Sequence, residues 1–285
     1  MTSLGLLIRY GLVILTTGLV SACFNNDSNN NDTSLLSLAL TDGAIDFAEA
    51  VNIDITGIEL KSQNTTHVFS FATRRINLLT LQGSQSESLL TDEVLPIGDY
   101  QWLRLQVESA SIVLAADGGE IPLTIPSSDQ TGFKLVSGFT LPVNGSASFT
   151  IDFDARKSVV MTGPENNRAY KLKPTMRLMN NIEAGHLAGS INGSLCEPES
   201  SMAVYVFDGF DAEVDDEGSS HSPVATSLVS DSFDYEVGFL IEGDYTLALA
   251  CNADVDFAES DDEVNFIAEQ NATVVAKVTR EYPFN

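Results

Sequence analysis

The chain has 285 residues, and its 40 acidic residues outnumber its 14 lysines and arginines, which gives a formal charge of −26 at pH 7. The length predicts one or two domains that can bury a core unaided, and a hydrophobic content of 44% excludes a disordered chain. The charge excludes nucleic acid as a partner because phosphates would be repelled, and three cysteines are too few for a disulfide-dense scaffold or a four-cysteine zinc site.

Residues 1–22 have the pattern of an export signal. Arg9 is the one charged residue before Cys23, and the apolar run GLVILTTGLV follows it. That run is too short to cross the hydrocarbon core as a helix, which needs roughly 20 residues. It ends in Val20-Ser21-Ala22 before Cys23, which resembles the lipobox of bacterial lipoproteins. The resemblance implies removal of the signal before Cys23, a diacylglycerol on its thiol and an acyl chain, such as palmitate, on its new amine.

Cys23 is therefore the predicted lipidation site, and membrane lipid is the predicted partner, since three acyl chains hold a bilayer far more firmly than one. The alternative is ordinary cleavage after Ala22 with an incidental cysteine. Phe24 stands where inner-membrane lipoproteins usually carry Asp, so we expect the bacterial outer membrane, with the periplasmic or exterior face left open. Residues 23–33, which include NNDSNNND, predict a flexible tether.

From residue 34 onward, hydrophobic and polar residues alternate, as they do in half-buried strands. Residues 148–153 (SFTIDF) and 245–251 (YTLALAC) show this most clearly, and Asn-Gly, Asp-Gly and Gly-Asp pairs recur as turn signals. Within residues 51–60 the apolar phase changes at Gly57, which predicts a β-bulge. Residues 78–90, broken at Gly83, predict one or two short helical turns. The sequence therefore predicts an all-β fold of the sandwich type.

The single tryptophan, Trp102, follows Tyr100 by two residues in the run DYQWLRL, so an unbroken strand would point both rings to one side. Carbohydrate-binding modules present flat aromatic faces of this kind to pyranose rings. Tyr100 and Trp102 are therefore the candidate ligand-binding residues. The alternative is that both rings pack in the core or on the sheet face.

Asp152 and Asp154 share a strand face with Arg156 on the alternating pattern. They are candidates for a glycosidase-like acid/base pair, and the alternative is an exposed ladder of ion pairs with Lys157 and Arg177, each contributing about 0–1 kcal/mol. None of the three histidines stands beside a nucleophile elbow, and no zinc-protease helix, P-loop or dinucleotide fingerprint occurs. No catalytic residue is therefore assigned, and we expect a protein that is not an enzyme.

Charge divides the remaining chain near residue 184. Residues 34–184 hold 17 acidic and 11 basic residues, whereas residues 185–285 hold 21 acidic and 2 basic residues. We expect a β-sandwich domain on each side of this boundary. In an exported chain, Cys196 and Cys251 are expected to form a disulfide that closes a loop of ~55 residues, the alternative being two buried free thiols.

Two acidic loops stand out in the second predicted domain, residues 208–217 (DGFDAEVDDE) and residues 254–263 (DVDFAESDDE). Clustered carboxylates can supply the oxygen ligands that Ca²⁺ requires, although the second loop lacks the glycine and the final glutamate of an EF-hand. The candidate metal ligands are Asp254, Asp256, Asp261 and Asp262, and no other cofactor is expected. The alternative is a solvated acidic surface. If the loops approach each other, repulsion between their carboxylates would favour a cation.

Five runs in the first predicted domain resemble bacterial lipoproteins that carry domain of unknown function 4382. They are residues 36–60 (LSLALTDGAIDFAEAVNIDITGIEL), 76–83 (INLLTLQG), 95–107 (LPIGDYQWLRLQV), 125–159 and 170–178 (YKLKPTMRL). Residues 185–285, with AVYVFDG and VGFLIEGDYTLALAC, more loosely resemble carboxypeptidase-regulatory or transthyretin-like β-sandwiches, which are grouped with starch-binding-like folds. The first resemblance implies no known activity, and the second implies a carbohydrate-binding-like fold.

Together these features predict an outer-membrane-anchored lipoprotein that acts without catalysis, as a binding or envelope structural module. Its expected partner, besides membrane lipid, is an envelope protein or a glycan. Three alternatives stay open: a carbohydrate-binding lipoprotein, a Ca²⁺-stabilised adhesion-type module, and a hydrolase that uses Asp152 and Asp154.

Overall fold

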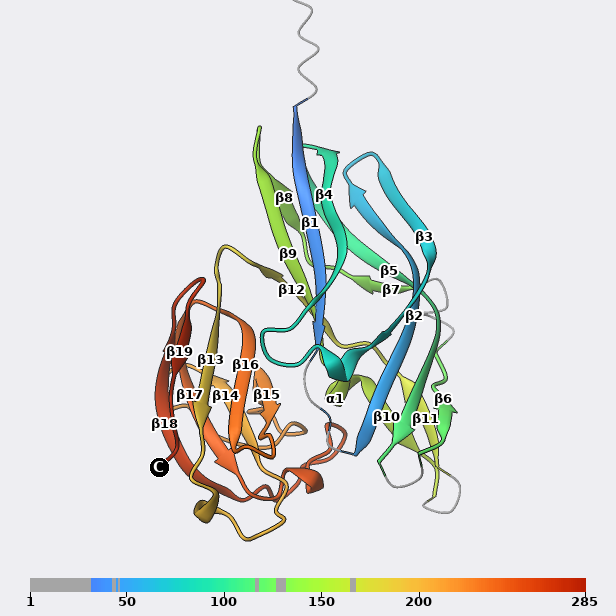
Figure 1. Ribbon diagram of the computed structural model, residues 1–285. Coiled ribbons are helices and arrows are strands. Elements are labelled where there is room, and N and C mark those ends of the chain that lie inside the picture. Colours follow the sequence, from blue (N-terminus) through green and yellow to red (C-terminus); the bar gives the residue numbers. More distant parts are fainter. Residues whose placement is uncertain (1–31, 43–44, 46, 116–117, 127–131, 165–167) are drawn as a thin grey trace, which may run out of the picture. The chain divides into compact units, whose positions relative to one another are not determined.

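The computed structural model describes residues 32–285 except 43–44, 46, 116–117, 127–131 and 165–167 (Figure 1). The predicted signal segment, Cys23 and nearly all of the predicted tether lie outside the described residues. Residues 32–285 form one compact unit. In the part of the chain that the structure describes, no helix is long and apolar enough to span a membrane.

The first half of this unit, residues 33–183, is built from two principal sheets. One has the order β12-β9-β1-β4, and the other has the order β3-β2-β5-β6, with β7 and β8 also paired to β5. Strands β10 and β11 pair separately. The elements are β1 (Thr33–Asp42), β2 (Ala48–Ser62), β3 (Thr66–Asn77), η1 (Leu78–Thr80), β4 (Glu87–Pro96), β5 (Gly98–Leu114), β6 (Glu120–Pro122), β7 (Phe133–Leu135), β8 (Phe139–Leu141), β9 (Ser146–Phe153), α1 (Ala155–Ser158), β10 (Val159–Thr162), β11 (Ala169–Leu172) and β12 (Met176–Asn180).

Both principal sheets bury their inward side chains in one shared hydrophobic core. Leu36, Leu38 and Leu40 of β1 and Ile53 of β2 are among its fully or almost fully buried members. The intervening outward positions are partly exposed, as expected for strands covered on one face. Each fully buried aliphatic side chain of this kind contributes roughly 1.5–3 kcal/mol.

The predicted bulge at Gly57 is confirmed. The pairing of β2 with both β3 and β5 changes register between Ile55 and Gly57, and Ile58 then takes the inward position. A β-carbon at Gly57 would lie 2.5 Å from the Phe69 carbonyl oxygen, so a larger residue would force the strands apart.

The second half, residues 184–285, also contains two sheets. Their orders are β16-β13-β19 and β15-β14-β17-β18. The elements are β13 (Ala184–Ser190), η3 (Gly193–Leu195), β14 (Ala203–Asp208), β15 (Ala225–Leu228), β16 (Asp234–Ile241), β17 (Gly243–Ala250), η4 (Ala253–Val255), β18 (Phe266–Val274) and β19 (Thr279–Glu281). The predicted disulfide is confirmed: Cys196 is bonded to Cys251, and their Cα atoms lie 5.5 Å apart.

Strands β14 and β17 are buried on both faces. Val204, Val206 and Leu247 face the core between the two sheets, whereas Tyr205 and Ala248 belong to a second cluster on the opposite face. Partly buried residues of the acidic loops and their surroundings, such as Val214 and Val264, cover that second cluster. This covering explains why two highly charged loops have a defined structure here.

The all-β prediction is confirmed by these sheets. Every described strand ladder joins strands of the same half, and the break falls between Asn180 and Ala184, close to the boundary that charge predicts. The helical prediction for residues 78–90 holds only for η1 (Leu78–Thr80). Its last four residues are wrong, because β4 begins at Glu87 and pairs with β1.

Candidate functional site

A short helical turn after β9 carries two cations toward the second half. β9 ends at Phe153, and the Asp154 side chain accepts a hydrogen bond from the Lys157 backbone N–H at 3.0 Å, which caps α1. The Ala155 N–H donates to Asp42 Oδ1 at 2.9 Å. The expectation that Asp152, Asp154 and Arg156 share one strand face is therefore wrong, because the strand ends between the first two of them.

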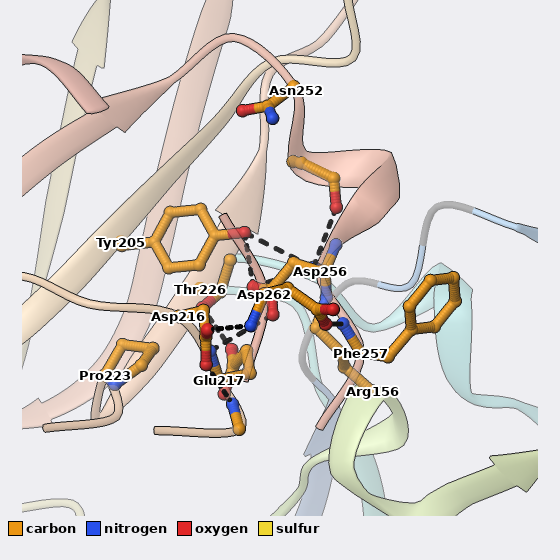
Figure 2. A network of polar contacts seen from close by, with 12 residues as sticks. Arg156, Tyr205, Asp216, Glu217, Pro223, Thr226, Asn252, Asp256, Phe257 and Asp262 are labelled. Carbon is orange, nitrogen blue, oxygen red and sulfur yellow. Dashed lines mark hydrogen bonds and ion pairs between the residues drawn. The ribbon is translucent and has the colours of Figure 1, made fainter. Parts of the chain in front are cut away.

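Arg156 enters a buried socket formed by Tyr205, the Ala253 carbonyl and Asp256 (Figure 2). Its Nη1 lies 3.4 Å from Tyr205 Oη, 3.3 Å from the Ala253 oxygen and 3.5 Å from Asp256 Oδ2. The side chains of Arg156 and Asp256 are 3% and 0% exposed. An ion pair this deeply buried requires further hydrogen bonds to offset its desolvation.

Asp256 receives those further hydrogen bonds. Tyr205 Oη donates to its Oδ2 at 2.6 Å, and the Glu217 backbone N–H donates to its Oδ1 at 3.1 Å. Burial raises the pKa of Asp256, although the Tyr205 hydroxyl and Arg156 act against that shift. Burial also raises the pKa of Tyr205 far above its ordinary value, so its hydroxyl stays a donor.

The two acidic loops meet through bonds between carboxylates and backbone N–H groups. Asp216 Oδ1 accepts from the Gly218 N–H at 2.7 Å, and its Oδ2 accepts from the Asp262 N–H. Asp262 Oδ2 in turn accepts from the Phe257 N–H at 2.9 Å (Figure 2). The bond from the Asp262 N–H to Asp216, together with that from the Glu217 N–H to Asp256, joins residues 208–217 to residues 254–263.

Lys157 forms the second charged contact between the halves. Its Nζ lies 2.8 Å from Glu217 Oε2 and donates to the Pro223 carbonyl at 2.9 Å. Burial by itself would lower the pKa of Lys157, but the carboxylates of Glu217 and Asp154 outweigh it and raise that pKa. Burial raises the pKa of Glu217, opposed by Lys157. Repulsion between the carboxylates of the acidic loops favours a nearby cation, and the loops contact two, Arg156 and Lys157. Both cations belong to the first half of the same chain.

The predicted metal ligands do not come together as one set. The carboxylate of Asp256 lies in the Arg156 socket, and that of Asp262 accepts the Phe257 N–H and the Ser260 hydroxyl. The carboxylates that do converge belong to Asp215, Asp216 and Asp261, whose ligand atoms lie within 4.8 Å of one another. Asp261 is thus the one predicted ligand that this group contains.

Asp152 and Asp154 line a cavity of about 200 Å³ together with Lys157 and Arg177. Asp152 is buried, and Arg177 Nε donates to its Oδ2 at 2.5 Å. Burial raises the pKa of Asp152, although Arg177 opposes that shift. A general acid must offer its proton to a substrate. Here Asp152 accepts from the Arg177 guanidinium and Asp154 accepts from the Lys157 backbone N–H, so both carboxylates already have partners within the chain.

Tyr100 and Trp102 point to opposite sides of their strand, so the expectation that they form one aromatic platform is wrong. Trp102 pairs with Lys61, whereas Tyr100 pairs with the next residue, Ser62, which leaves Gln101 as an extra residue in the ladder. Tyr100 is 1% exposed and stacks on Phe139 at 5.0 Å between ring centroids. A bulge of this kind exchanges the faces of a strand, which simple alternation does not reveal.

Trp102 lies on the partly exposed outer face, where two cations contact its ring. The Arg104 guanidinium carbon is 5.0 Å, and the Lys134 Nζ 4.8 Å, from the ring centroid. Arg104 is also paired with Glu59 at 2.8 Å. Trp102 therefore stays the candidate ligand-binding residue of this face, without Tyr100.

Sequence reasoning missed Tyr205 and Glu217 as site residues. A signal for Tyr205 was present, because the run AVYVF at residues 203–207 does not alternate and so indicates a strand buried on both faces. The role of Glu217 had no local signal, since it depends on Lys157, 60 positions away in the chain.

Residues 33–174 match the family model described as Domain of unknown function (DUF4382). This match confirms the resemblance of the first half to that family. No curated protein sequence matches the chain.

Solved structures that match the chain include the Bacillus anthracis TIE protein, at 9% identity and a TM-score of 0.23, covering 88% of this chain and 33% of that chain. The minor pilin GBS52 of Streptococcus agalactiae is 12% identical with a TM-score of 0.23, over 87% of this chain and 94% of its own. The shaft pilin SpaA of Lactobacillus rhamnosus GG is 8% identical with a TM-score of 0.22, over 88% and 97%. The chain spans about a third of the TIE protein. Similarity at this level carries no conclusion about function.

Proposed function

From a first half that matches the DUF4382 family, we propose that the chain is an outer-membrane lipoprotein, anchored through acylated Cys23, that acts as a non-enzymatic binding or envelope structural module. We also propose that the second half is a sandwich of the carboxypeptidase-regulatory type. One observation carries the non-enzymatic part: the buried carboxylates of Asp152, Glu217 and Asp256 are each paired with a cation of the chain itself.

The anchor is tested by mass spectrometry of the mature protein and by fractionation of the envelope. We expect an amino-terminal Cys23 that carries three acyl chains and a protein that sediments with outer membranes. Cys23→Ser is expected to release the protein into the soluble fraction. An unmodified chain that retains residues 1–22 would contradict the anchor.

The binding role is tested by capture from native envelope with the acyl anchor intact, followed by identification of bound proteins and glycans. A specific partner that the Asp152→Asn and Asp154→Asn variants still capture supports a non-enzymatic module. Hydrolysis of an envelope polymer that both variants abolish would support the hydrolase instead.

A glycan ligand is the second candidate, and the position of Trp102 favours it. An indole on an outward sheet face can stack on a sugar ring, and the adjacent Lys134 and Arg104 can hold an anionic substituent. The proposed ligand is therefore an acidic glycan.

A glycan array with the wild-type protein and Trp102→Ala tests this candidate. We expect acidic glycans to bind the wild type and Trp102→Ala to lose about tenfold in affinity, the equivalent of ~1.4 kcal/mol. Tyr100→Phe is the matched control, because its ring is buried and should not touch a ligand. Equal binding by the wild type and Trp102→Ala would remove this candidate.

A further inference from the structure

We propose that the second half contains a binding socket for a guanidinium group. Its occupant is Arg156 of the first half, and the occupied socket couples the folding of the two halves. The socket consists of Tyr205 Oη, the Ala253 carbonyl and Asp256, with the residues of the acidic loops that hold Asp256 in place. This coupling is independent of the proposed function, because it depends only on contacts between residues of the two halves.

The charge of the second half favours a cation from outside it. The second half carries 21 acidic residues and two basic residues, Lys277 and Arg280, and both of these are exposed. Asp256 and Glu217, by contrast, have side chains that are 0% and 2% exposed. Buried carboxylates need a cation nearby, and Arg156 and Lys157 of the first half supply it.

The geometry of the acceptors in the socket suits a guanidinium group. A phenol oxygen, a backbone carbonyl and a carboxylate oxygen all lie between 3.3 and 3.5 Å from one terminal nitrogen of Arg156. A planar guanidinium with several fixed N–H donors suits such a spread set of acceptors, and it is less strongly hydrated than an ammonium group. The socket therefore fits guanidinium better than a lysine or an amine.

The socket depends on both acidic loops. Glu217 of the first loop donates its N–H to Asp256 of the second, and Asp216 accepts the N–H of Asp262. Ala253 lies two residues after Cys251, so the disulfide fixes the start of the segment that supplies the carbonyl. An empty socket would leave a buried carboxylate without its cation and would loosen both loops.

Chemical rescue of Arg156→Ala tests the proposal in the full chain. We expect the variant to melt about 10 °C lower than the wild type and the acidic loops to become sites of limited proteolysis. Ethylguanidinium at ten times its dissociation constant should then raise the melting temperature by roughly 3–6 °C. Ethylammonium at the same concentration should not raise it.

Arg104→Ala is the matched control, because Arg104 also forms an ion pair with a carboxylate, Glu59, but within the first half. We expect ethylguanidinium to leave the melting temperature of this control and of the wild type unchanged or slightly lowered. Failure of ethylguanidinium to rescue Arg156→Ala, or equal rescue by ethylammonium, would overturn the proposal.

Hydrogen exchange of the wild-type protein keeps the proposal testable if Arg156→Ala does not accumulate. We expect the Lys157, Glu217 and Asp262 backbone amides to become exposed in one common opening event. The Lys157 amide lies in the turn that presents Arg156, the Glu217 amide donates to Asp256, and the Asp262 amide donates to Asp216, the neighbour of Glu217. Independent exchange of α1 and the acidic loops would contradict the coupling.

Discussion

At the scale of one residue, the role of the Asp256 carboxylate depends on the groups that contact it. Its place in the run DVDFAESDDE makes it a candidate Ca²⁺ ligand, whereas in the folded chain it accepts from Tyr205, Arg156 and the Glu217 N–H. Sequence spacing identifies a group that can bind a cation, and only tertiary contacts determine which cation it receives.

The Tyr205 hydroxyl is expected to be more important to stability than an ordinary tyrosine hydroxyl. Tyr205→Phe removes a 2.6 Å donor from a buried carboxylate, and we expect a loss of about 1–3 kcal/mol in urea unfolding. In the control Tyr245→Phe, the lost hydroxyl donates at 2.8 Å to the neutral Ile241 carbonyl, and we expect about 1 kcal/mol or less. Equal losses for the two variants would contradict the role given to Tyr205.

The three buried carboxyls give stability a defined dependence on pH. Burial raises the pKa of Asp152, Glu217 and Asp256. At a pH between the unfolded and the folded pKa, each group is therefore more protonated in the folded chain than in the unfolded chain. The free energy of unfolding therefore falls as pH rises through their folded pKa values. His186 acts in the opposite direction below about pH 6.5, because burial lowers its pKa.

Melting temperatures at constant ionic strength check this dependence, and we expect them to fall as pH rises above the ordinary carboxyl pKa of about 4. Repulsion between the surface charges of a chain of charge −26 also lowers stability as pH rises. Salt screens this repulsion, whereas it screens the interactions of buried groups much less. The slope should therefore persist at high salt and should be shallower in Glu217→Gln. A slope that vanishes in high salt would assign the effect to surface charge.

At the scale of elements, the junction of the halves depends on one capped turn and on one close backbone approach. α1 presents Arg156 and Lys157, and elsewhere the loop at Gly83 lies directly against β16 at Gly238. A β-carbon at Gly238 would lie 1.9 Å from the Gly83 carbonyl oxygen, a distance that no packing tolerates. Glycine is required there because two backbones meet.

Gly238→Ala is therefore expected to cost about 1–3 kcal/mol, through forced separation of β16 from the Gly83 loop. Gly243→Ala is the matched control in the next strand, where the nearest atom to a new β-carbon is 3.7 Å away, and we expect a change within about 0.5 kcal/mol. Denaturant unfolding of both variants provides the measurement. A loss in the control as large as that in Gly238→Ala would mean that backbone flexibility, not the junction, is responsible.

At the scale of the whole molecule, part of the excess acidity of the second half is offset by cations of the first half. The strongly acidic second half receives Arg156 and Lys157 from the more balanced first half, and residues 32–285 form one compact unit. We therefore expect the two halves to unfold together rather than in separate transitions.

Calcium is expected to have little effect on this arrangement. Asp216, Asp256 and Asp262 already accept N–H, hydroxyl or guanidinium donors, so we expect 1 mM Ca²⁺ to change the melting temperature by less than about 2 °C. Differential scanning calorimetry with Ca²⁺ and with a chelator measures the change. A larger rise, lost in Asp261→Asn, would place a metal at Asp215, Asp216 and Asp261.

The sequence by itself determined the all-β class, the bulge at Gly57 and the Cys196–Cys251 disulfide. These features follow from alternation, from one glycine and from cysteine count, all of which are local or compositional properties. Only the tertiary structure decided that Trp102 and Tyr100 face opposite sides and that Arg156 fills an acidic socket. An unpaired extra residue in a ladder and an ion pair across 100 positions depend on which segments meet in space, and no local pattern encodes that.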